Sequence, residues 1–203
     1  HNYGTSRFNS PSSLVEYNQD GFVTWGWKEQ ETYSGNFLPL PSPFMCSFYN
    51  RHKQLNNNII MVGNNMNPFF YCFQGYPNSN QLIDYRKNKI DFIQNLENPI
   101  LDVLFYRPYG NSPYSFQDFD YVKSNFASIK RVEGNLHSKI LRCKLLVLDH
   151  PGTTLLIALS ANIPFVCYWE KDHFPLSSQF NEIYDIFFGL NIFFITPIDA
   201  SNH

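Results

Sequence analysis

Residues 144–169, KLLVLDHPGTTLLIALSANIPFVCYW, constrain the fold more than any other stretch of the chain. Residues 144–148 are a short apolar run, typical of a strand covered on both faces. The run is broken at residues 149–152, and residues 153–161 are then apolar nearly all round, as in a buried helix. An Asn-x-Pro tripeptide ends this helix, and a second buried strand follows at residues 165–169. The segment therefore predicts a β-α-β unit.

The turn inside this unit is a candidate ligand site. It places a helix N-terminus, with unpaired N–H groups and the positive end of a dipole, at the carboxyl edge of a strand, where phosphate is a common guest. Gly152 lets a ligand approach the backbone, and Thr153 and Thr154 offer hydroxyl and N–H groups. His150 is suited to bind a phosphate oxygen or a leaving group. In a purely structural alternative, Asp149 or Thr153 caps the helix and His150 has no ligand.

Strands and helices alternate from residue 58 onward. This pattern predicts an α/β domain with a Rossmann-like parallel sheet, helices on both faces and ligands at the carboxyl ends of the strands. Besides the central unit, we expect strands at residues 59–62, 100–106 and 128–132, and helices at residues 81–96, 116–126, 136–142 and 178–190.

Residues 1–57 differ from the rest, because they are rich in Ser, Asn, Pro and aromatic residues. Ser12 or Ser13 is placed to cap a short helix, and residues 22–27 form an expected strand. The three prolines of residues 38–43 exclude a central strand or a helix there, so that segment is expected to be an extended linker. We therefore place a domain boundary after residue 57.

Composition narrows the function classes. The chain has 203 residues, of which 43% are hydrophobic and 16% charged, as in a globular protein. A formal net charge of −2 removes the usual electrostatic case for nucleic acid as a partner. No apolar run approaches the roughly 18 residues of a membrane span. No C-x-x-C spacing occurs, and Cys143 and Cys167 fall where small buried hydrophobes are expected, so a reduced, cytoplasmic setting is expected.

The central segment resembles the C-terminal, donor-binding half of GT-B glycosyltransferases. The resemblance lies in its order of elements, which is strand, D-H-x-G-T-T, buried helix, N-I-P, strand and Trp. The chain is more closely similar to transferases assigned to bacterial surface-polysaccharide synthesis. Such proteins also carry an H-x-Y-G loop, here at residues 1–4, and a D-x-F-x-T-W-G-W segment, here at residues 20–27. The resemblance covers nearly the whole chain in order, and the D-H-P-G-T-T turn is its most specific part.

The resemblance implies a metal-independent enzyme that moves a sugar from a nucleotide-activated donor to a glycan or lipid-linked glycan acceptor, without a cofactor. It implies that residues 1–57 end the acceptor-side domain and that residues 58–203 form the nucleotide-sugar-binding domain. It also allows peripheral association with the inner face of the plasma membrane. Since the chain begins with His1 inside a motif, we expect a fragment of a longer protein that is inactive alone.

Further residues are candidates for the site. His1 is the candidate general base on the acceptor hydroxyl if its loop closes over the crevice, and Tyr3 and Gly4 are candidate substrate contacts in the same loop. In the alternative, His1 is an ordinary loop residue and its neighbour Gly4 makes the contact. Arg107 follows a predicted strand and is suited to a bidentate pair with phosphate, unless it forms only a surface salt bridge. Glu170 is suited to accept ribose hydroxyls, unless it is merely solvated.

Asp118 and Asp120 form a D-x-D sequence, which holds a divalent metal in GT-A glycosyltransferases. Here it stands at the start of a predicted helix, where acidic residues are favoured by the helix dipole. We therefore expect two helix-start residues and no metal site.

Three alternatives stay open at this stage. The same scaffold suits a nucleotide-sugar epimerase or a polyol-phosphate transferase. A non-catalytic module that binds a nucleotide or a glycan is the third, since most of one domain is expected to be missing.

Overall fold

The structure is a computed structural model that describes residues 13–28, 34–64, 77, 80–109 and 116–203. Its centre is a sheet of six strands in the order β5-β4-β3-β6-β7-β8, in which every neighbouring pair is parallel. The strands are β3 (Ile59–Val62), β4 (Leu104–Arg107), β5 (Lys130–Arg131), β6 (Leu145–Leu148), β7 (Phe165–Tyr168) and β8 (Phe193–Phe194). This arrangement confirms the expected α/β class with a Rossmann-like parallel sheet.

The strand order reverses at the middle of the sheet. Counted along the chain, the six strands lie in the order 3-2-1-4-5-6, which is that of the doubly wound dinucleotide-binding fold. β3 pairs with β4 on one side and with β6 on the other, with Ile59 opposite both Leu104 and Leu145. Ligands of such sheets bind in the crevice outside the carboxyl ends of the two strands where the order reverses. The fold therefore directs attention to the ends of β3 and β6.

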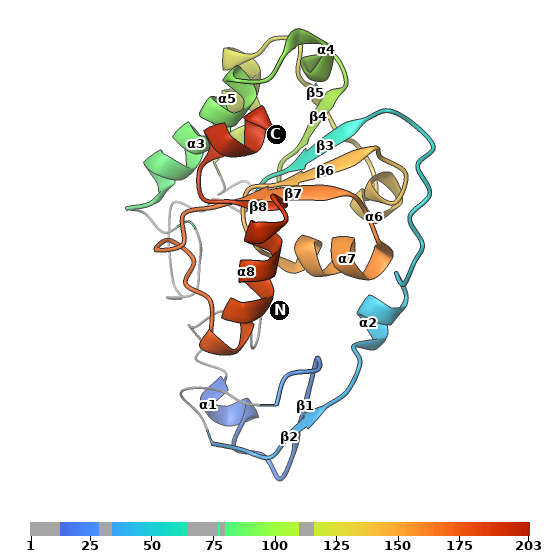
Figure 1. The fold of residues 1–203 in the computed structure, drawn as a ribbon, viewed down its shortest axis with the longest axis vertical. Coiled ribbons are helices and arrows are strands. Elements are labelled where there is room, and N and C mark those ends of the chain that lie inside the picture. The colour runs from blue at the N-terminus through green and yellow to red at the C-terminus, as the bar shows by residue number, and fades with distance from the viewer. Residues whose placement is uncertain (1–12, 29–33, 65–76, 78–79, 110–115) are drawn as a thin grey trace.

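Helices cover both faces of the sheet (Figure 1). One side carries α3 (Leu82–Gln94), α5 (Asp118–Asn125) and α9 (Pro197–Asn202), and the other carries α6 (Leu136–Ile140), α7 (Thr153–Ala161) and α8 (Asn181–Gly189). A hydrophobic core lies on each side, because alternate residues of each strand face opposite ways. Within β3, Met61 belongs to one core and Ile60 to the other.

The β-α-β unit that was expected at residues 144–169 is confirmed as β6, α7 and β7. Asn162 ends α7 in the left-handed conformation, with φ 58°, which the short polar side chain of Asn tolerates. The prediction of a helix buried all round was wrong on one side, because Leu159 is 40% exposed. The remaining side of α7 packs through Leu155 and Ala158, which are buried.

The strand expected at residues 100–106 was wrong at its start. Residues Asn98–Leu101 form a helical turn, α4, and the strand β4 begins only at Leu104. Pro99 favours the first turn of a helix because its missing N–H has no partner there in any case. The shift moves the end of the strand from Tyr106 to Arg107.

The C-terminal part was incompletely predicted. The helix expected at residues 178–190 is a 3₁₀ turn, Ser178–Phe180, followed by α8, and Ile183 is 48% exposed although its spacing predicted a core position. β8 and α9 were not predicted at all. α9 has a readable start signal, since Thr196 caps it by accepting from the Asp199 N–H and Pro197 opens its first turn.

Before the main sheet, the chain forms a small unit of its own. It consists of α1 (Ser13–Glu16) and two short parallel strands, β1 (Phe22–Thr24) and β2 (Phe37–Pro39). Tyr17 and Trp27 are buried in this unit, and their ring centroids lie 5.9 Å apart. Figure 1 shows the unit below the main sheet, connected to it by the segment that carries α2 (Pro43–Cys46).

The expected linker at residues 38–43 is extended at its start and helical at its end. Pro39 lies in a two-stranded sheet, where its missing N–H costs little, and Ser42 caps α2 by accepting from the Met45 N–H. Beyond α2 the chain lies against the C-terminal end of α7, since the Asn50 N–H donates to the Ser160 carbonyl at 3.0 Å. The connection is therefore fixed to the main domain through backbone hydrogen bonds.

Candidate active site

Polar side chains, all buried except the partly exposed His150, gather beside the switch point of the sheet. They come from helix α3, from strand β4, from the start of α5 and from the turn after β6. The members of this polar cluster are Tyr85, Lys89, Tyr106, Asp118, Asp149 and His150.

Lys89 is the centre of the polar cluster. Its side chain is fully buried, and its Nζ atom lies 2.5 Å from Oδ2 of Asp118 and 3.7 Å from Oδ2 of Asp149. It also donates to the hydroxyl of Tyr106 at 2.7 Å and lies 4.4 Å from the centre of the Tyr85 ring. A buried ammonium requires such partners, because burial without them costs several kcal/mol. One cation thus holds together two carboxylates from distant parts of the chain.

The two tyrosine hydroxyls complete the cluster as donors. The Tyr85 hydroxyl donates to Oδ2 of Asp149 at 2.5 Å and accepts from the Asn64 N–H at 2.6 Å, and the Tyr106 hydroxyl donates to Asp118. Burial, and next the nearby carboxylate charges, raise the pKa of both phenols well above the ordinary value. Both hydroxyls therefore remain protonated and keep donating at any pH at which the fold is studied.

Asp149 orients His150. Oδ1 of Asp149 lies 3.0 Å from Nδ1 of His150, and the carboxylate is buried while the imidazole is partly exposed. With Asp149 ionised, Nδ1 carries the shared proton, and Nε2 is left as the acceptor of the neutral ring. The contact with Asp149 thus fixes the orientation of the imidazole ring.

The imidazole of His150 lies across Gly152. A Cβ atom at Gly152 would stand 2.3 Å from Nε2 of His150, which real contacts do not allow. The backbone of Gly152 is extended, with φ −89°, so the glycine is needed for space and not for conformation. Gly152 is itself the N-cap of α7 and no side chain caps that helix, so the capping alternative for Asp149 and Thr153 was wrong.

Thr153 and Thr154 are the first two residues of α7, and both are half-buried. Their N–H groups belong to the first turn, which has no partner within the helix. They follow His150 after Pro151 and Gly152, in the turn at the carboxyl end of β6. The structure therefore places an imidazole and a helix N-terminus next to each other at the switch point.

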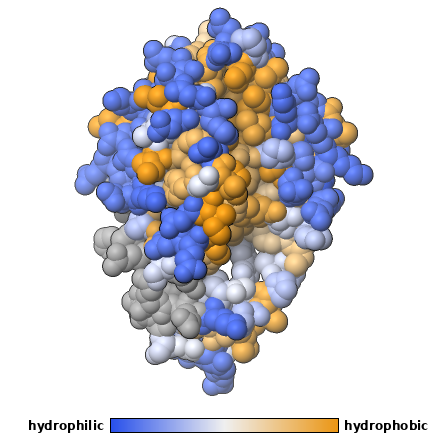
Figure 2. All heavy atoms as spheres, in the orientation of Figure 1, coloured by the Kyte–Doolittle hydropathy of each residue, from blue (hydrophilic) through white to orange (hydrophobic). Residues whose placement is uncertain are grey.

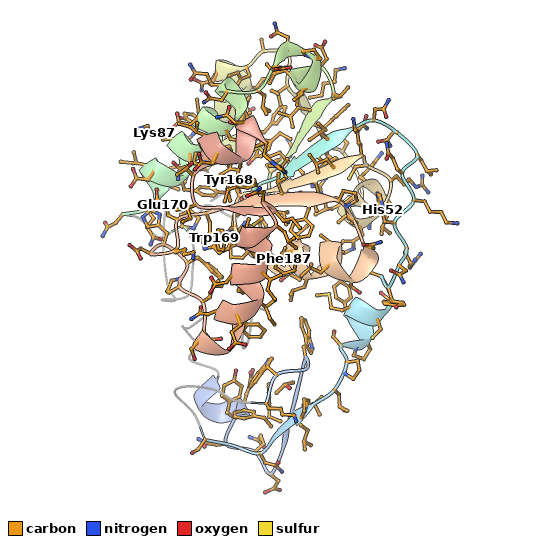
Figure 3. All side chains as sticks on the ribbon, in the orientation of Figure 1. His52, Lys87, Tyr168, Trp169, Glu170 and Phe187 are labelled. Carbon is orange, nitrogen blue, oxygen red and sulfur yellow. The ribbon has the colours of Figure 1, made fainter. Side chains whose placement is uncertain are left out.

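Arg107 and Glu170 stand at the same edge but are engaged elsewhere. Nη1 of Arg107 donates to the carbonyls of Val132 and Gly134, each at 2.9 Å, which fixes the loop after β5. Oε1 of Glu170 accepts from Asn88 at 3.3 Å. These contacts leave the proposed ligand roles of both residues untested, and Figure 3 shows Glu170 at the left edge of the sheet.

Asp118 and Asp120 do not form a common site. Asp118 begins α5, as expected, but it is buried and paired with Lys89, which the sequence did not predict, and Asp120 is exposed. Within the described ranges, no group of three His, Cys, Asp or Glu side chains is placed to hold a metal ion. Metal independence remains a prediction.

His1, Tyr3 and Gly4 lie outside the described residues.

Sequence reasoning missed Lys89, Tyr85 and Tyr106. A signal was present in α3, because Tyr85 and Lys89 stand on the same helical face as Phe92, at spacings of four and three residues. A lysine within an apolar face is rarely fully buried unless it is paired. The position of Lys89 could have indicated a buried carboxylate partner, and the structure supplies two, Asp118 and Asp149.

The close packing around Lys89 gives a first prediction. We expect Gly63→Ala to lower the free energy of unfolding by about 1–3 kcal/mol, since the new Cβ would stand 2.0 Å from the Tyr106 hydroxyl. Gly189→Ala is the matched control, because nothing lies within 4 Å of a Cβ there, and it should be neutral or slightly stabilising. Urea denaturation of both variants measures the difference. Equal free energies of unfolding for the two variants would show that the polar cluster accommodates the added methyl group, and would contradict the prediction.

The structure thus combines a doubly wound, Rossmann-like parallel sheet with an Asp–His pair and a helix N-terminus at its switch point, the position where sheets of this class bind their ligands. A family model described as "LIC12162 family transferase" matches residues 1–203, so the chain belongs to this family of transferases. No curated protein and no solved structure matches the chain. None of the helices in the described part of the chain has the length and hydropathy of a transmembrane segment.

Proposed function

We propose that this transferase is a glycosyltransferase that moves a sugar from a nucleotide-activated donor to a glycan or lipid-linked glycan of the cell surface. The observation that carries the proposal is the Asp149–His150 pair beside the N-terminus of α7, at the switch point of a Rossmann-like sheet. This arrangement suits a phosphate-linked leaving group. The order of motifs along the chain, which resembles the donor half of GT-B enzymes, supports the same reading.

In the proposed reaction, an acceptor oxygen attacks the anomeric carbon of the donor. The bond from that carbon to the phosphate oxygen breaks, and the phosphate leaves with the electron pair. The N–H groups of Thr153 and Thr154 stabilise the negative charge that develops, and His150, in its imidazolium form with protons on both ring nitrogens, donates the Nε2 proton to the leaving phosphate. Arg107 adds a guanidinium once it exchanges a carbonyl partner for phosphate. Glu170 accepts from the ribose.

The acceptor side belongs to the H-x-Y-G loop in this proposal. His1 acts as the general base that takes the proton of the acceptor hydroxyl, and Tyr3 and Gly4 contact the substrate. Lys89 and the tyrosines have a supporting role, since they fix Asp149 and thereby the ring of His150. The reaction requires neither a metal ion nor a cofactor, and it takes place in the cytoplasm, at the inner face of the plasma membrane when the acceptor is lipid-linked.

The test begins with binding. We expect nucleoside diphosphates and monophosphates to raise the melting temperature of the chain, and the matching nucleosides to leave it unchanged, because the site is built around the phosphate. A ligand at 100 times its Kd stabilises by about 2.7 kcal/mol. A screen of UDP-, GDP-, CMP- and dTDP-sugars by thermal shift identifies the donor. Stabilisation by nucleosides alone would place the ligand elsewhere and contradict the proposal.

Product analysis then decides between the transferases. Mass spectrometry of the acceptor after reaction with the best donor should show the mass of one sugar added, with or without EDTA. An added polyol phosphate would establish the polyol-phosphate transferase instead. A donor sugar that changes only its stereochemistry would establish an epimerase, a class that the family description does not favour. Complete loss of transfer in EDTA would contradict the metal-independent mechanism.

A further inference from the structure

An apolar cavity of about 460 Å³ lies at the amino edge of the sheet, opposite the candidate active site. It is lined by residues at the beginnings of β3, β6 and β7, among them Ile59, Leu145 and Phe165, and by Phe92 of α3 and Ala200 of α9. The strands have four residues each, so the two edges are roughly 13 Å apart at about 3.3 Å per residue. The cavity is therefore separate from the polar cluster.

A strip of cations occupies the same edge. This basic strip consists of Arg51, Lys53, Lys139, Arg142 and Lys144, all exposed. Residues 43–58 and 135–148, which carry it, contain no Asp or Glu. Among the described residues, no ion pair joins the strip to a carboxylate. In a chain with a net charge of −2, this is a local concentration of positive charge without compensation.

Backbone hydrogen bonds hold the two halves of the basic strip together. The Lys53 N–H donates to the Leu141 carbonyl and the Leu55 N–H to the Arg142 carbonyl, each at 3.0 Å. The Lys144 N–H donates to the Asn58 carbonyl at 2.9 Å. The cations are thus fixed beside one another by the fold.

The basic strip and the cavity adjoin. Lys144 directly precedes Leu145, which lines the cavity and pairs with Ile59, another lining residue. Figure 2 shows hydrophobic surface down the middle of the view with a hydrophilic band along its right side, where Figure 1 draws the segment before β3. Large exposed apolar side chains stand close to the basic strip in the sequence, since Tyr49, two residues before Arg51, is 70% exposed and Leu55, two residues after Lys53, is 66% exposed.

We propose that the amino edge of the sheet binds anionic phospholipid at a membrane surface, with an acyl chain in the apolar cavity and the headgroup phosphate on the basic strip. Cations next to exposed aromatic and aliphatic side chains are the combination by which peripheral proteins hold an anionic bilayer. A nucleic acid or another polyanion would use the cations alone and would leave the cavity and Leu55 without a partner. The inference does not rest on glycosyl transfer.

The first experiment is vesicle flotation with the full chain. It should float with phosphatidylcholine vesicles that contain phosphatidylglycerol, and stay behind with phosphatidylcholine alone. The triple variant Lys53→Gln, Arg142→Gln, Lys144→Gln should bind on the order of 100-fold more weakly, because each basic residue near an anionic surface contributes about fivefold. The matched control is Lys28→Gln, Lys87→Gln, Lys130→Gln, which makes the same change in charge on other exposed lysines. Equal losses in both triples would overturn the proposal.

The second experiment tests the cavity. Ser201→Trp places a ring into the cavity from the last helix, where Ser201 is half-buried, so folding is little disturbed. It should weaken binding of monomeric lysophosphatidylglycerol at least tenfold, measured by calorimetry, while the triple variant weakens it as well. Glycerol phosphate, which lacks the acyl chain, should bind far more weakly than the lysolipid to the unaltered chain. Equal affinity for both probes, or binding of heparin without binding of vesicles, would overturn the proposal.

Discussion

Lys89→Met is expected to lower the free energy of unfolding by about 3–5 kcal/mol. Methionine fills the space of the buried side chain, but it leaves the carboxylates of Asp118 and Asp149 without their cation. Removing one partner of a buried ion pair costs this much because an uncompensated charge stays in the interior. Urea denaturation followed by circular dichroism measures the loss.

Lys87→Met is the matched control for this prediction. Lys87 lies two residues away on the same helix and is exposed, so its replacement should change stability by no more than about 0.5 kcal/mol. Figure 3 shows Lys87 on the outer side of α3. The double variant Lys89→Met, Asp118→Asn should recover part of the loss, because one of the stranded charges is gone. Fully additive losses would show that the two side chains do not interact.

His150→Ala is expected to lower kcat of the proposed transfer by about 10²–10⁴-fold. The ring is held by Asp149 at 3.0 Å, and its Nε2 is the proton donor that the proposal assigns to the leaving phosphate. Because the side chain is only 13% exposed, circular dichroism of the variant is needed to show that the fold is kept. Initial rates at saturating donor measure the effect. Asp149→Asn should reduce the rate as well, since it turns a carboxylate acceptor into an amide.

The control for His150 is His137→Ala. His137 packs against Phe44 and Phe48 and has no role in the proposed reaction, so its loss should leave kcat unchanged. A comparison of donors with good and poor leaving groups separates a proton donor from a mere contact. Proton donation matters less when the leaving group is already stable. An equal loss of rate with every donor would contradict the assigned role and favour a structural one.

The sequence predicted the fold well where one local signal dominated. The helix at residues 153–161 was predicted with its observed bounds, because Gly152 and Asn162 mark its ends and the residues between them are mostly apolar. The β3 strand, Ile59–Val62, was equally clear, since a fully buried strand is apolar throughout. The strand at residues 100–106 failed because Ile100 and Leu101 fit a helical turn and a strand equally well. Short apolar runs do not distinguish the two.

The candidate site was predicted only in part, for a different reason. The turn after β6 has a local sequence signal, so Asp149, His150 and Gly152 were predicted as site residues. Their contacts with other parts of the chain could not be predicted. Lys89 and Asp118 stand far apart in the sequence and meet only when α3 and α5 pack on the same side of the sheet. Each alone has an ordinary explanation, as a surface lysine or a helix-start carboxylate. Their pairing follows from the topology and not from any local pattern.

The strand order has a consequence for how the protein folds. β4 is the next strand of the main sheet along the chain after β3, whereas β3 and β6 become neighbours only after β4, β5 and the rest of the chain between Ile59 and Leu145 have been arranged. Loop-closure entropy makes such distant pairings slow, and parallel sheets fold late for this reason. Lys89 belongs to the first half and Asp149 to the second, so the polar cluster is completed only when the two halves dock. In a nascent chain in which β6 has not yet formed, the edge of β3 is unpaired and can pair with other chains. The chain is therefore most prone to aggregate at this stage.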